Sequence, residues 1–294
     1  MKVLVVTNKW WECDPALAAL INDNSRPANS LWPTALAPSR PRPETVTTFN
    51  VSPQPRALLN FHTFTAEVWC ISDLLEGYST DQQSSSERKA GLLGKIFQGP
   101  APDLVIAVGT AATPDMTNRN GGVVIGSQVF MHNGQPNGSN PDSNLNLPTF
   151  DQLIPSTLSD GMFNKLNAVN RMEAEKRFLP VPLNPSPKPE LLFDRNSVSL
   201  GTVNVSKTAD YAVADLATLS AFQSLGTTST PVSVETTHGL IRSQSNSPFI
   251  FVSGIVNRFQ QFGVDVASRS YAQNTAGAHN AGIAVAWLLD ALDS

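Results

Sequence analysis

Short apolar runs alternate with helix-like segments along this chain, and this alternation narrows the possible folds more than any other feature of the sequence. Leu104–Val108 is continuously apolar, as is typical of a parallel strand that is buried on both faces. Strands that alternate with helices indicate a mostly parallel sheet covered by helices on both sides. We therefore predict an α/β fold, a single domain with a mostly parallel central mixed sheet flanked by helices.

The individual elements follow from apolar runs, helix caps and turn residues. Strands are expected at Lys2–Thr7, Thr65–Ile71, Leu104–Val108, Gly122–Phe130, Val198–Val205, Val232–Thr236 and Phe249–Gly254. Helices are expected at Pro15–Ile21, over most of Pro155–Arg177, and at Ser84–Phe97, Ala212–Leu225 and Ala276–Leu292. Asp14 suits an N-cap, and Pro15 suits the first helical position.

Two segments interrupt this pattern. Asn22–Pro55 is so rich in proline that it excludes a continuous helix and a central strand, which leaves room for a short strand at Thr45–Val51. Gly134–Pro148 is polar and rich in turn residues, as expected of either a solvated insertion or a lid over a site. Since no segment has the composition of a linker between domains, we expect one domain over residues 1–294.

The bulk composition excludes several classes of partner. The formal net charge is −4 and no block of Lys and Arg occurs, so binding to nucleic acid or to an anionic membrane is not expected. Charged residues make up 15% of the chain, below the typical value of about 25%, so the surface must depend on neutral polar residues. No apolar run has the length of a signal peptide or a membrane span, and a cytoplasmic location is expected.

Cysteine and histidine give little sign of metal chemistry. Cys13 and Cys70 are expected to be buried reduced thiols, with a disulfide or a nucleophilic role as the alternatives. The four histidines lack the short spacing of a metal site: His62, His132, His238 and His279. No phosphate-binding loop, dinucleotide fingerprint or nucleophile elbow is present, so neither metal nor organic cofactor is expected.

Polar or small residues follow four of the predicted strands. These are Glu12, Gly109-Thr110, Glu235 to His238, and Asn257-Arg258. Ligands of open α/β sheets bind beyond the carboxyl ends of the strands. We therefore expect a ligand site at this edge of the sheet.

The order and spacing of these four groups resemble the nucleoside phosphorylase/nucleosidase family. The resemblance covers most of the chain apart from Asn22–Pro55 and Gly134–Pro148. It implies that family's α/β fold, a small nucleoside-like ligand, cleavage of an N-glycosidic bond and a homo-oligomer. The alternative on the same fold is a non-catalytic ligand-binding, storage or interaction protein.

Two parts of the pattern correspond to the reacting centre. Glu12 lies where methylthioadenosine/S-adenosylhomocysteine nucleosidases place the glutamate that activates water, although an acid entering a helix is also favoured by the helix dipole. Gly109-Thr110-Ala111-Ala112 resembles the family's Gly-Ser/Thr-Ala-Gly turn, which holds the phosphate or nucleophile. Tight packing of a strand against a helix would also need small residues there.

The remaining positions correspond to the sugar and the base. Val234-Glu235-Thr236-Thr237 resembles the family's Val-Glu-Met-Glu segment, which holds ribose, and Glu235 and Thr237 should share one face of a strand. His238 follows them and could reach a 5′ group. Asn257 occupies the position of the acid that protonates a purine, and an amide there suits a 6-oxopurine; a turn asparagine is the alternative. Tyr211 lies near the family's base-stacking aromatic, although a core tyrosine is as plausible.

The resemblance favours hydrolysis over phosphorolysis. The hexameric phosphorylases place an arginine where this chain has Ala107, and after the first strand no arginine occurs before Arg26. A phosphate dianion without an arginine partner would be bound poorly. The leading hypothesis is a nucleosidase in which Glu12 orients water and Asn257 meets the base, with a phosphorylase that uses Arg258 as a weaker option.

Overall fold

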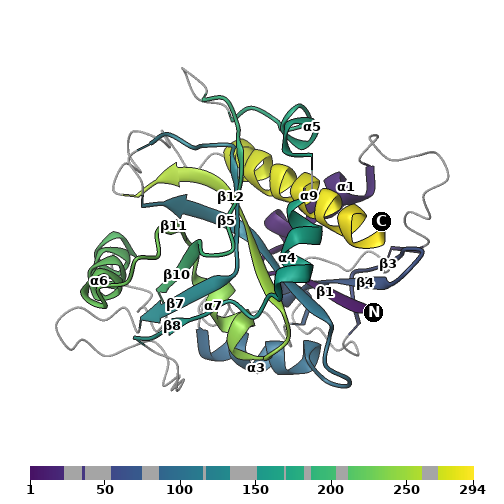
Figure 1. The fold of residues 1–294 in the computed structure, drawn as a ribbon, viewed down its shortest axis with the longest axis horizontal. Helices are drawn as coiled ribbons and strands as arrows, with labels where there is room; N and C mark the ends of the chain where they lie inside the picture. The colour runs from purple at the N-terminus through teal and green to yellow at the C-terminus, as the bar shows by residue number, and fades with distance from the viewer. Residues whose placement is uncertain are drawn as a thin grey trace, which may run out of the picture.

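The computed structural model describes residues 1–22, 35–36, 54–74, 86–114, 117–132, 151–168, 170–181, 187–202, 211–259 and 271–294. The elements within these ranges form a mixed sheet with helices on both faces, as predicted from the sequence (Figure 1). The predicted strand at 45–51 and the predicted loop at 134–148 lie outside the described residues, as does most of the proline-rich segment 22–55.

Strand β1 (Lys2–Thr7) lies at the centre of one part of the sheet, where the sequence predicted it. It pairs in parallel with β4 (Thr65–Cys70) on one side and with β5 (Leu104–Thr113) on the other. Its five residues Val3 to Thr7 are buried, because helices cover both faces of the sheet. The carboxyl end of β1 lies opposite Val108, and β5 continues beyond it to Thr113.

Strand β5 connects the two parts of the sheet. It pairs in parallel with β12 (Phe249–Arg258) along most of its length, and its far end meets β11 (Pro231–Val234) through Ala112. Beyond β11 lie β10 (Val198–Thr202), β7 (Gln128–His132) and β8 (Leu153–Ile154). On the other side of β12 lie β6 (Val123–Gly126) and β9 (Leu191–Phe193), and the sheet is extended beyond β4 by β3 (Ala57–Asn60) and β2 (Ala35–Leu36).

The helices form two layers. On one side, α9 (Tyr271–Asp293) lies along α1 (Trp10–Asn22) and next to α4 (Asp160–Asn167), as Figure 1 shows. On the other side, α3 (Ser86–Ile96) packs against α7 (Thr236–Ser243) and near the short 3-10 helix η2 (Ile71–Leu74). Helix α6 (Tyr211–Ser224) covers β10 and β7, and the short α5 (Arg171–Glu175) lies against β9.

Each layer encloses its own apolar core. The core under α1 and α9 includes Val5, Leu20, Ile106 and Leu288, and the core under α3 and α7 includes Leu4, Leu93, Val105 and Ile241. Neighbouring residues of β1 and β5 thus point to opposite cores, as the pleat of a strand requires. Because the sheet separates the two helix layers, polar side chains from opposite layers can meet only at the edges of the sheet.

Helix α1 approaches α9 so closely that a glycine is needed at the contact. A Cβ atom added to Gly282 would lie 2.2 Å from the backbone oxygen of Ala16, which is closer than any real carbon–oxygen contact. This contact fixes the position of α1, the helix that carries Glu12.

Most predicted elements are confirmed, but several boundaries are wrong. The strand predicted at Phe249–Gly254 continues to Arg258, so Asn257 and Arg258 lie within β12 and do not follow it. Helix α1 begins at Trp10, before the predicted Pro15, and Asp14 is therefore not its N-cap. The small-residue segment after Leu104–Val108 is not a loop, because Gly109 and Thr110 continue β5 opposite Ser253 and Gly254 of β12.

The other two errors concern segments predicted as single strands. The predicted strand Gly122–Phe130 is two strands, β6 and β7, which separate at Ser127 and pair with different neighbours. The predicted strand Val232–Thr236 ends at Val234, and Thr236 already belongs to α7, a helix that the sequence analysis missed.

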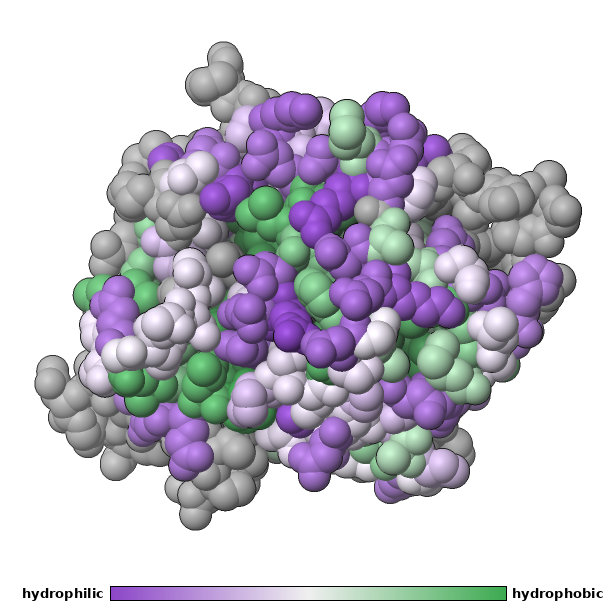
Figure 2. All heavy atoms as spheres, viewed as in Figure 1, coloured by the Kyte–Doolittle hydropathy of each residue, from purple (hydrophilic) through white to green (hydrophobic). Residues whose placement is uncertain are grey.

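The surface in Figure 2 is largely hydrophilic, and apolar residues reach it on the left of the view, near α6. Leu216 and Leu225, in and just after this helix, are each 42% exposed. In the described parts of the chain, no helix combines the length and the apolar character needed to cross a bilayer.

We expect Gly282→Ala to lower the free energy of unfolding by about 1–3 kcal/mol, because the added methyl group forces α9 away from α1. Gly94→Ala is the matched control, since this exposed position in α3 has no atom within 4 Å of the added Cβ. It should raise the free energy of unfolding by about 0.5–1 kcal/mol. Urea unfolding measures both, and equal effects of the two substitutions would contradict the close contact.

Candidate active site at the carboxyl ends of β1 and β5

Glu12 joins the start of α1 to the end of β5. Its Oε1 accepts hydrogen bonds from the backbone N–H of Thr110 at 3.0 Å and from Thr110 Oγ1 at 2.9 Å. Its Oε2 accepts from the backbone N–H of Lys9 at 3.1 Å, the bond by which an acid in the first turn caps its own helix. Glu12 is only 3% exposed, so the three hydrogen bonds fix its carboxyl group.

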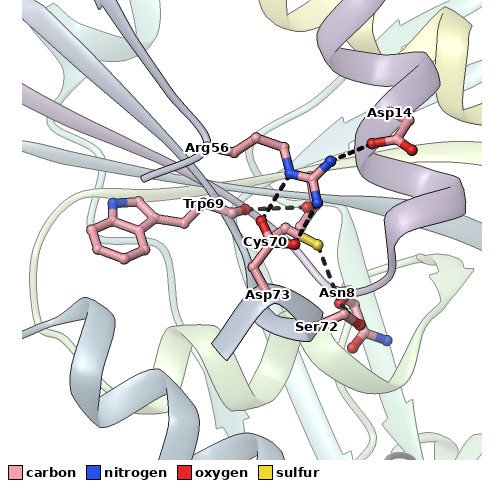
Figure 3. A network of polar contacts seen from close by, with 8 residues as sticks. Asn8, Asp14, Arg56, Trp69, Cys70, Ser72 and Asp73 are labelled. Atoms are coloured by element: carbon pink, nitrogen blue, oxygen red, sulfur yellow. Dashed lines mark hydrogen bonds and ion pairs between the residues drawn. The ribbon is translucent and has the colours of Figure 1, made fainter. Parts of the chain in front are cut away.

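A network of polar contacts holds the turn that precedes Glu12 (Figure 3). The backbone oxygen of Asn8 accepts from Ser72 Oγ at 2.9 Å and from the Ser72 N–H at 3.1 Å, and Cys70 Sγ lies 3.8 Å from it. Arg56 binds Asp73 through two nitrogens, and its Nη1 lies 2.5 Å from Asp14 Oδ1. Ser72 thus ties the turn between β1 and α1 to η2, and Arg56, just before β3, ties α1 to η2.

Cys13 and Cys70 are free thiols, and both are buried, as predicted. Burial, a hydrogen bond with Cys13 and the charges of nearby groups raise the pKa of Cys70 well above its ordinary value. A buried thiol whose pKa is raised is unreactive, so Cys70 contributes packing.

Glu235 is the N-cap of α7, and this replaces the predicted arrangement in which Glu235 and Thr237 alternate along a strand. Its Oε2 accepts from the backbone N–H groups of Thr237 at 2.5 Å and of His238 at 2.7 Å. These N–H groups have no partner within the helix, and the carboxylate satisfies them. Thr236 is half-buried in the first turn and Thr237 is 1% exposed.

Gly109 is the point at which three of these side chains meet. A Cβ atom added there would lie 3.4 Å from His238 Nε2, 3.5 Å from Glu235 Cγ and 3.6 Å from Glu12 Oε1. The structure therefore brings Glu12, Glu235 and His238 together over one residue of β5. They come from α1, on one face of the sheet, and from α7, on the other.

The environment of Glu12 shifts its titration to near neutral pH. Burial and the neighbouring Glu235 carboxylate raise the pKa of Glu12 to about 7, against the opposing effect of the hydrogen bonds from Thr110 and Lys9. Burial also raises the pKa of Glu235, while the Lys89 ammonium and the N–H groups of α7 lower it. A carboxyl group that titrates near neutral pH can act as a general base or a general acid.

Two lysines that the sequence analysis did not single out face these acids. Lys89 of α3 is 6% exposed, and its Nζ lies 3.5 Å from Thr237 Oγ1. Burial and the like charge of Lys9 lower the pKa of Lys89 to about 8, whereas Glu235 and Glu12 act to raise it. Burial likewise lowers the pKa of Lys9, and Glu12 raises it.

His238 is buried within the cluster and is not on an open surface. Its Nδ1 lies 3.0 Å from Ser199 Oγ, its ring stacks on Phe251 with centroids 5.5 Å apart, and its Nε2 lies 3.8 Å from Glu235 Oε2. Burial lowers the pKa of His238 to about 3, so its ring is neutral at working pH. Within the described residues, Nε2 is buried without a hydrogen-bond partner.

The remaining predicted site residues lie in β5, near the end of β12 and at the start of α6. Asn257 is half-buried near the end of β12, opposite Ala112, and its Nδ2 donates to the backbone oxygen of Arg258 at 3.2 Å. Ala111 is buried in β5, one residue beyond Thr110. Tyr211 is the first residue of α6, and its side chain lies outside the described part of the structure.

Among the side chains that the structure describes, no group of three or more His, Cys, Asp or Glu residues is arranged to hold a metal ion.

Solved structures that are similar to this chain include nucleosidases. A 5′-methylthioadenosine/S-adenosylhomocysteine nucleosidase from Colwellia psychrerythraea, in complex with adenine, matches 99% of this chain and 96% of its own, with a TM-score of 0.55 and 13% identity. A mutant of the Helicobacter pylori nucleosidase with 5′-methylthioadenosine in the active site matches 98% of both chains, with a TM-score of 0.54 and 11% identity. This chain has the nucleosidase fold.

A second kind of enzyme has the same fold. The futalosine hydrolase of Helicobacter pylori matches 99% of this chain and 97% of its own, with a TM-score of 0.53 and 10% identity. Neither a protein-family model nor a curated protein matches the sequence. At this level of identity the likeness establishes the nucleosidase fold, and the reaction must be argued from the residues of the site.

Replacing Glu12 should change how stability depends on pH. Between the ordinary glutamate pKa and about 7 the folded protein holds a proton that the unfolded chain has released, so Glu12 contributes stability that is lost as pH rises through this window. The free energy of unfolding should therefore fall between pH 5 and 8. We expect Glu12→Gln to make this fall smaller by about 3 kcal/mol.

Urea unfolding at a series of pH values measures the effect. Glu173→Gln, on the surface of α5, is the matched control for loss of a carboxyl group. If the Glu12→Gln variant and the unmodified protein lost stability in parallel over this range, Glu12 would not carry the proton.

Proposed function

We propose that this protein hydrolyses the N-glycosidic bond of a purine nucleoside or a related compound. The single observation that carries the proposal is the fixed, buried carboxyl group of Glu12, held by Thr110 at the carboxyl end of β5 on a nucleosidase fold. Glu12 lies at the sheet edge at which ligands of open α/β folds bind.

In the proposed reaction, the ionised Glu12 orients a water molecule and takes its proton. Cleavage of a glycosidic bond builds positive charge on the sugar, and a carboxylate at this position stabilises that charge as well as the attacking water. A pKa of about 7 leaves Glu12 partly ionised at neutral pH and basic enough to accept the proton. Thr110 keeps the carboxyl group in place through its N–H and its hydroxyl.

The site favours water over phosphate as the nucleophile. Ala107 is buried within β5, where the phosphorylases that the sequence resembles have an arginine. The cations beside Glu12 and Glu235 are Lys9 and Lys89, whose charges are balanced by these two acids. A phosphate dianion would have to enter next to both carboxyl groups, and within the described part of the chain no arginine is seen to contact either of them.

We propose that this site holds the sugar differently from the way in which members of the resembling family hold ribose. Thr237 replaces the second acid of that family's segment, and Glu235 uses Oε2 to cap α7. Asn257 would meet the base through its amide, which can donate to a ring nitrogen but cannot protonate it. These differences favour a base that is a good leaving group, with 6-oxopurines ahead of adenine.

Cellular location and assembly complete the proposal. We propose a cytoplasmic enzyme that forms a homo-oligomer, on the grounds of the family resemblance. A non-catalytic ligand-binding protein remains the second candidate, and the specific observation in its favour is the engagement of Glu235 and Thr237 in contacts within the protein.

The test is to incubate the purified protein with inosine, guanosine, adenosine, 5′-methylthioadenosine and futalosine, with and without inorganic phosphate, and to measure the released base. We expect release from at least one nucleoside without phosphate, and we expect Glu12→Gln to lower kcat by about 10²–10⁴-fold. Glu173→Gln, at the surface of α5, should retain full activity.

Three results would contradict the proposal or its mechanism. Base release only in the presence of phosphate would indicate a phosphorylase. Full activity in the Glu12→Gln variant would exclude the proposed base. Thermal stabilisation by a nucleoside without any cleavage across the panel would indicate the ligand-binding protein.

A further inference from the structure

His238 has one ring nitrogen that no group in the described part of the chain satisfies. Its Nδ1 lies 3.0 Å from Ser199 Oγ, whereas its Nε2 is buried without a hydrogen-bond partner among the described residues. Glu235 Oε2 lies 3.8 Å from Nε2, which is too long for a hydrogen bond. Burying a polar atom without a partner destabilises a folded protein, so native structures ordinarily supply one.

Nε2 faces Gly109 of β5. A Cβ atom added to Gly109 would lie 3.4 Å from His238 Nε2, 3.5 Å from Glu235 Cγ and 3.6 Å from Glu12 Oε1, all ordinary van der Waals distances. An alanine would therefore fit, and the φ angle of Gly109 is not one that requires glycine. Since glycine weakens a strand relative to alanine, its presence here indicates the close approach of another group.

A second buried polar atom borders the place over Gly109. Ser253 of β12 is the register partner of Gly109 and is fully buried, and its Oγ has no hydrogen-bond partner in the described part of the chain. Ser253 lies two residues after Phe251, on which the His238 ring stacks, so its side chain is on the face of the sheet that α7 covers. Two unpartnered polar atoms and the Glu12 carboxyl group therefore border the same place.

We propose that the place over Gly109 binds the water molecule that attacks the sugar, and that His238 is a catalytic residue that holds this water together with Glu12. The catalytic role depends on the proposed function, whereas the binding of water does not. A water oxygen must stay about 3.3 Å from Gly109 Cα, farther out than a Cβ atom would lie, and so comes within hydrogen-bonding reach of Nε2 and Oε1. A buried water typically makes about three hydrogen bonds, and Glu12, His238 and Ser253 supply three partners.

The two partners have different roles in the reaction. The water donates one hydrogen bond to the ionised Glu12 and the other to His238 Nε2, while the proton on Nδ1 is donated to Ser199 Oγ. As the water oxygen bonds to the sugar carbon, the electron pair of the carbon–nitrogen bond leaves with the base. Glu12 takes the proton of the water and returns it to the departing base, so that the neutral base is released. His238 stays neutral because burial lowers its pKa to about 3, and it orients the water without taking its proton.

The first test fills the place over Gly109 and needs no substrate. The matched control is Gly201→Ala in β10, where an added Cβ atom would also lie 3.4–3.6 Å from its nearest neighbours. Displacing a water leaves its polar partners unsatisfied, so we expect Gly109→Ala to melt at least about 2 °C below Gly201→Ala. A crystal structure of the unmodified protein should show a water within about 3.2 Å of both His238 Nε2 and Glu12 Oε1, and that of Gly109→Ala should not. Equal melting of the two variants would overturn the proposal, as would a crystal structure of the unmodified protein without this water.

The second test is kinetic and uses any nucleoside that the unmodified protein cleaves. Gly109→Ala and His238→Leu should each lower kcat by about 10²-fold or more and change KM by less than about threefold, because the water is not part of the nucleoside. His238→Gln has an amide in place of the ring nitrogens and should recover at least about tenfold of the loss.

The possible failures are distinguishable. Full activity of a folded Gly109→Ala or His238→Leu variant would overturn the catalytic role of His238, even if the water is present. If the unmodified protein cleaves no nucleoside, the proposed function and the catalytic role both fail, whereas the melting temperatures and crystal structures still decide whether His238 binds water.

Discussion

The hydrogen bonds between Glu12 and Thr110 are the contact on which the rest of this site depends. They join the first turn of α1 to the end of β5, and so connect a helix of one layer to the central sheet at the point where the second layer begins. Because the same carboxyl group also caps α1 through Lys9, the helix cannot move without moving the acid. Fold and site are therefore set by the same three hydrogen bonds.

Several supporting contacts serve this one arrangement. Gly282 lets α9 press α1 against the sheet, and the bonds from Ser72 to Asn8 hold the preceding turn. From the opposite layer, Glu235 turns toward the start of its own helix and faces Glu12 across Gly109. Two carboxyl groups brought together in a buried place push the pKa of one of them toward neutrality, which is a common way to make a general base. Lys9 and Lys89 act as opposite charges to these acids and so lower the free-energy cost of ionising them in a buried place.

The sequence predicted the fold class and most elements, because buried strands and amphipathic helices leave a periodic pattern that local rules detect. Lys2–Thr7 was predicted with its boundaries correct. Errors arose where tertiary contacts override local preference. Val232–Thr236 is rich in β-branched residues, yet the chain turns into a helix at Thr236 because the Glu235 carboxylate caps it. The apolar pair Leu240 and Ile241, three and four residues after Thr237, was the available sign of that helix.

The site was harder to predict than the fold, because its charge balance depends on contacts between distant segments. Lys89 lies in a helix that was predicted, but a lysine on a helix ordinarily faces water, and nothing local shows that α7 covers it. Likewise, the sequence cannot show that His238 is buried against Phe251. The roles of Asn257 and Tyr211 toward a base stay predictions.

The measurement that tests the central claim most directly is the fate of isotopic oxygen during turnover. When a cleaved nucleoside is incubated in water enriched in oxygen-18, with phosphate also present, mass spectrometry of the released sugar identifies the nucleophile. Attack by water oriented by Glu12 predicts a free sugar that carries one oxygen-18 atom from the enriched solvent at the former glycosidic carbon, formed at a much lower rate by the Glu12→Gln variant. A sugar phosphate as the product, or labelled sugar formed equally fast without Glu12, would contradict the account.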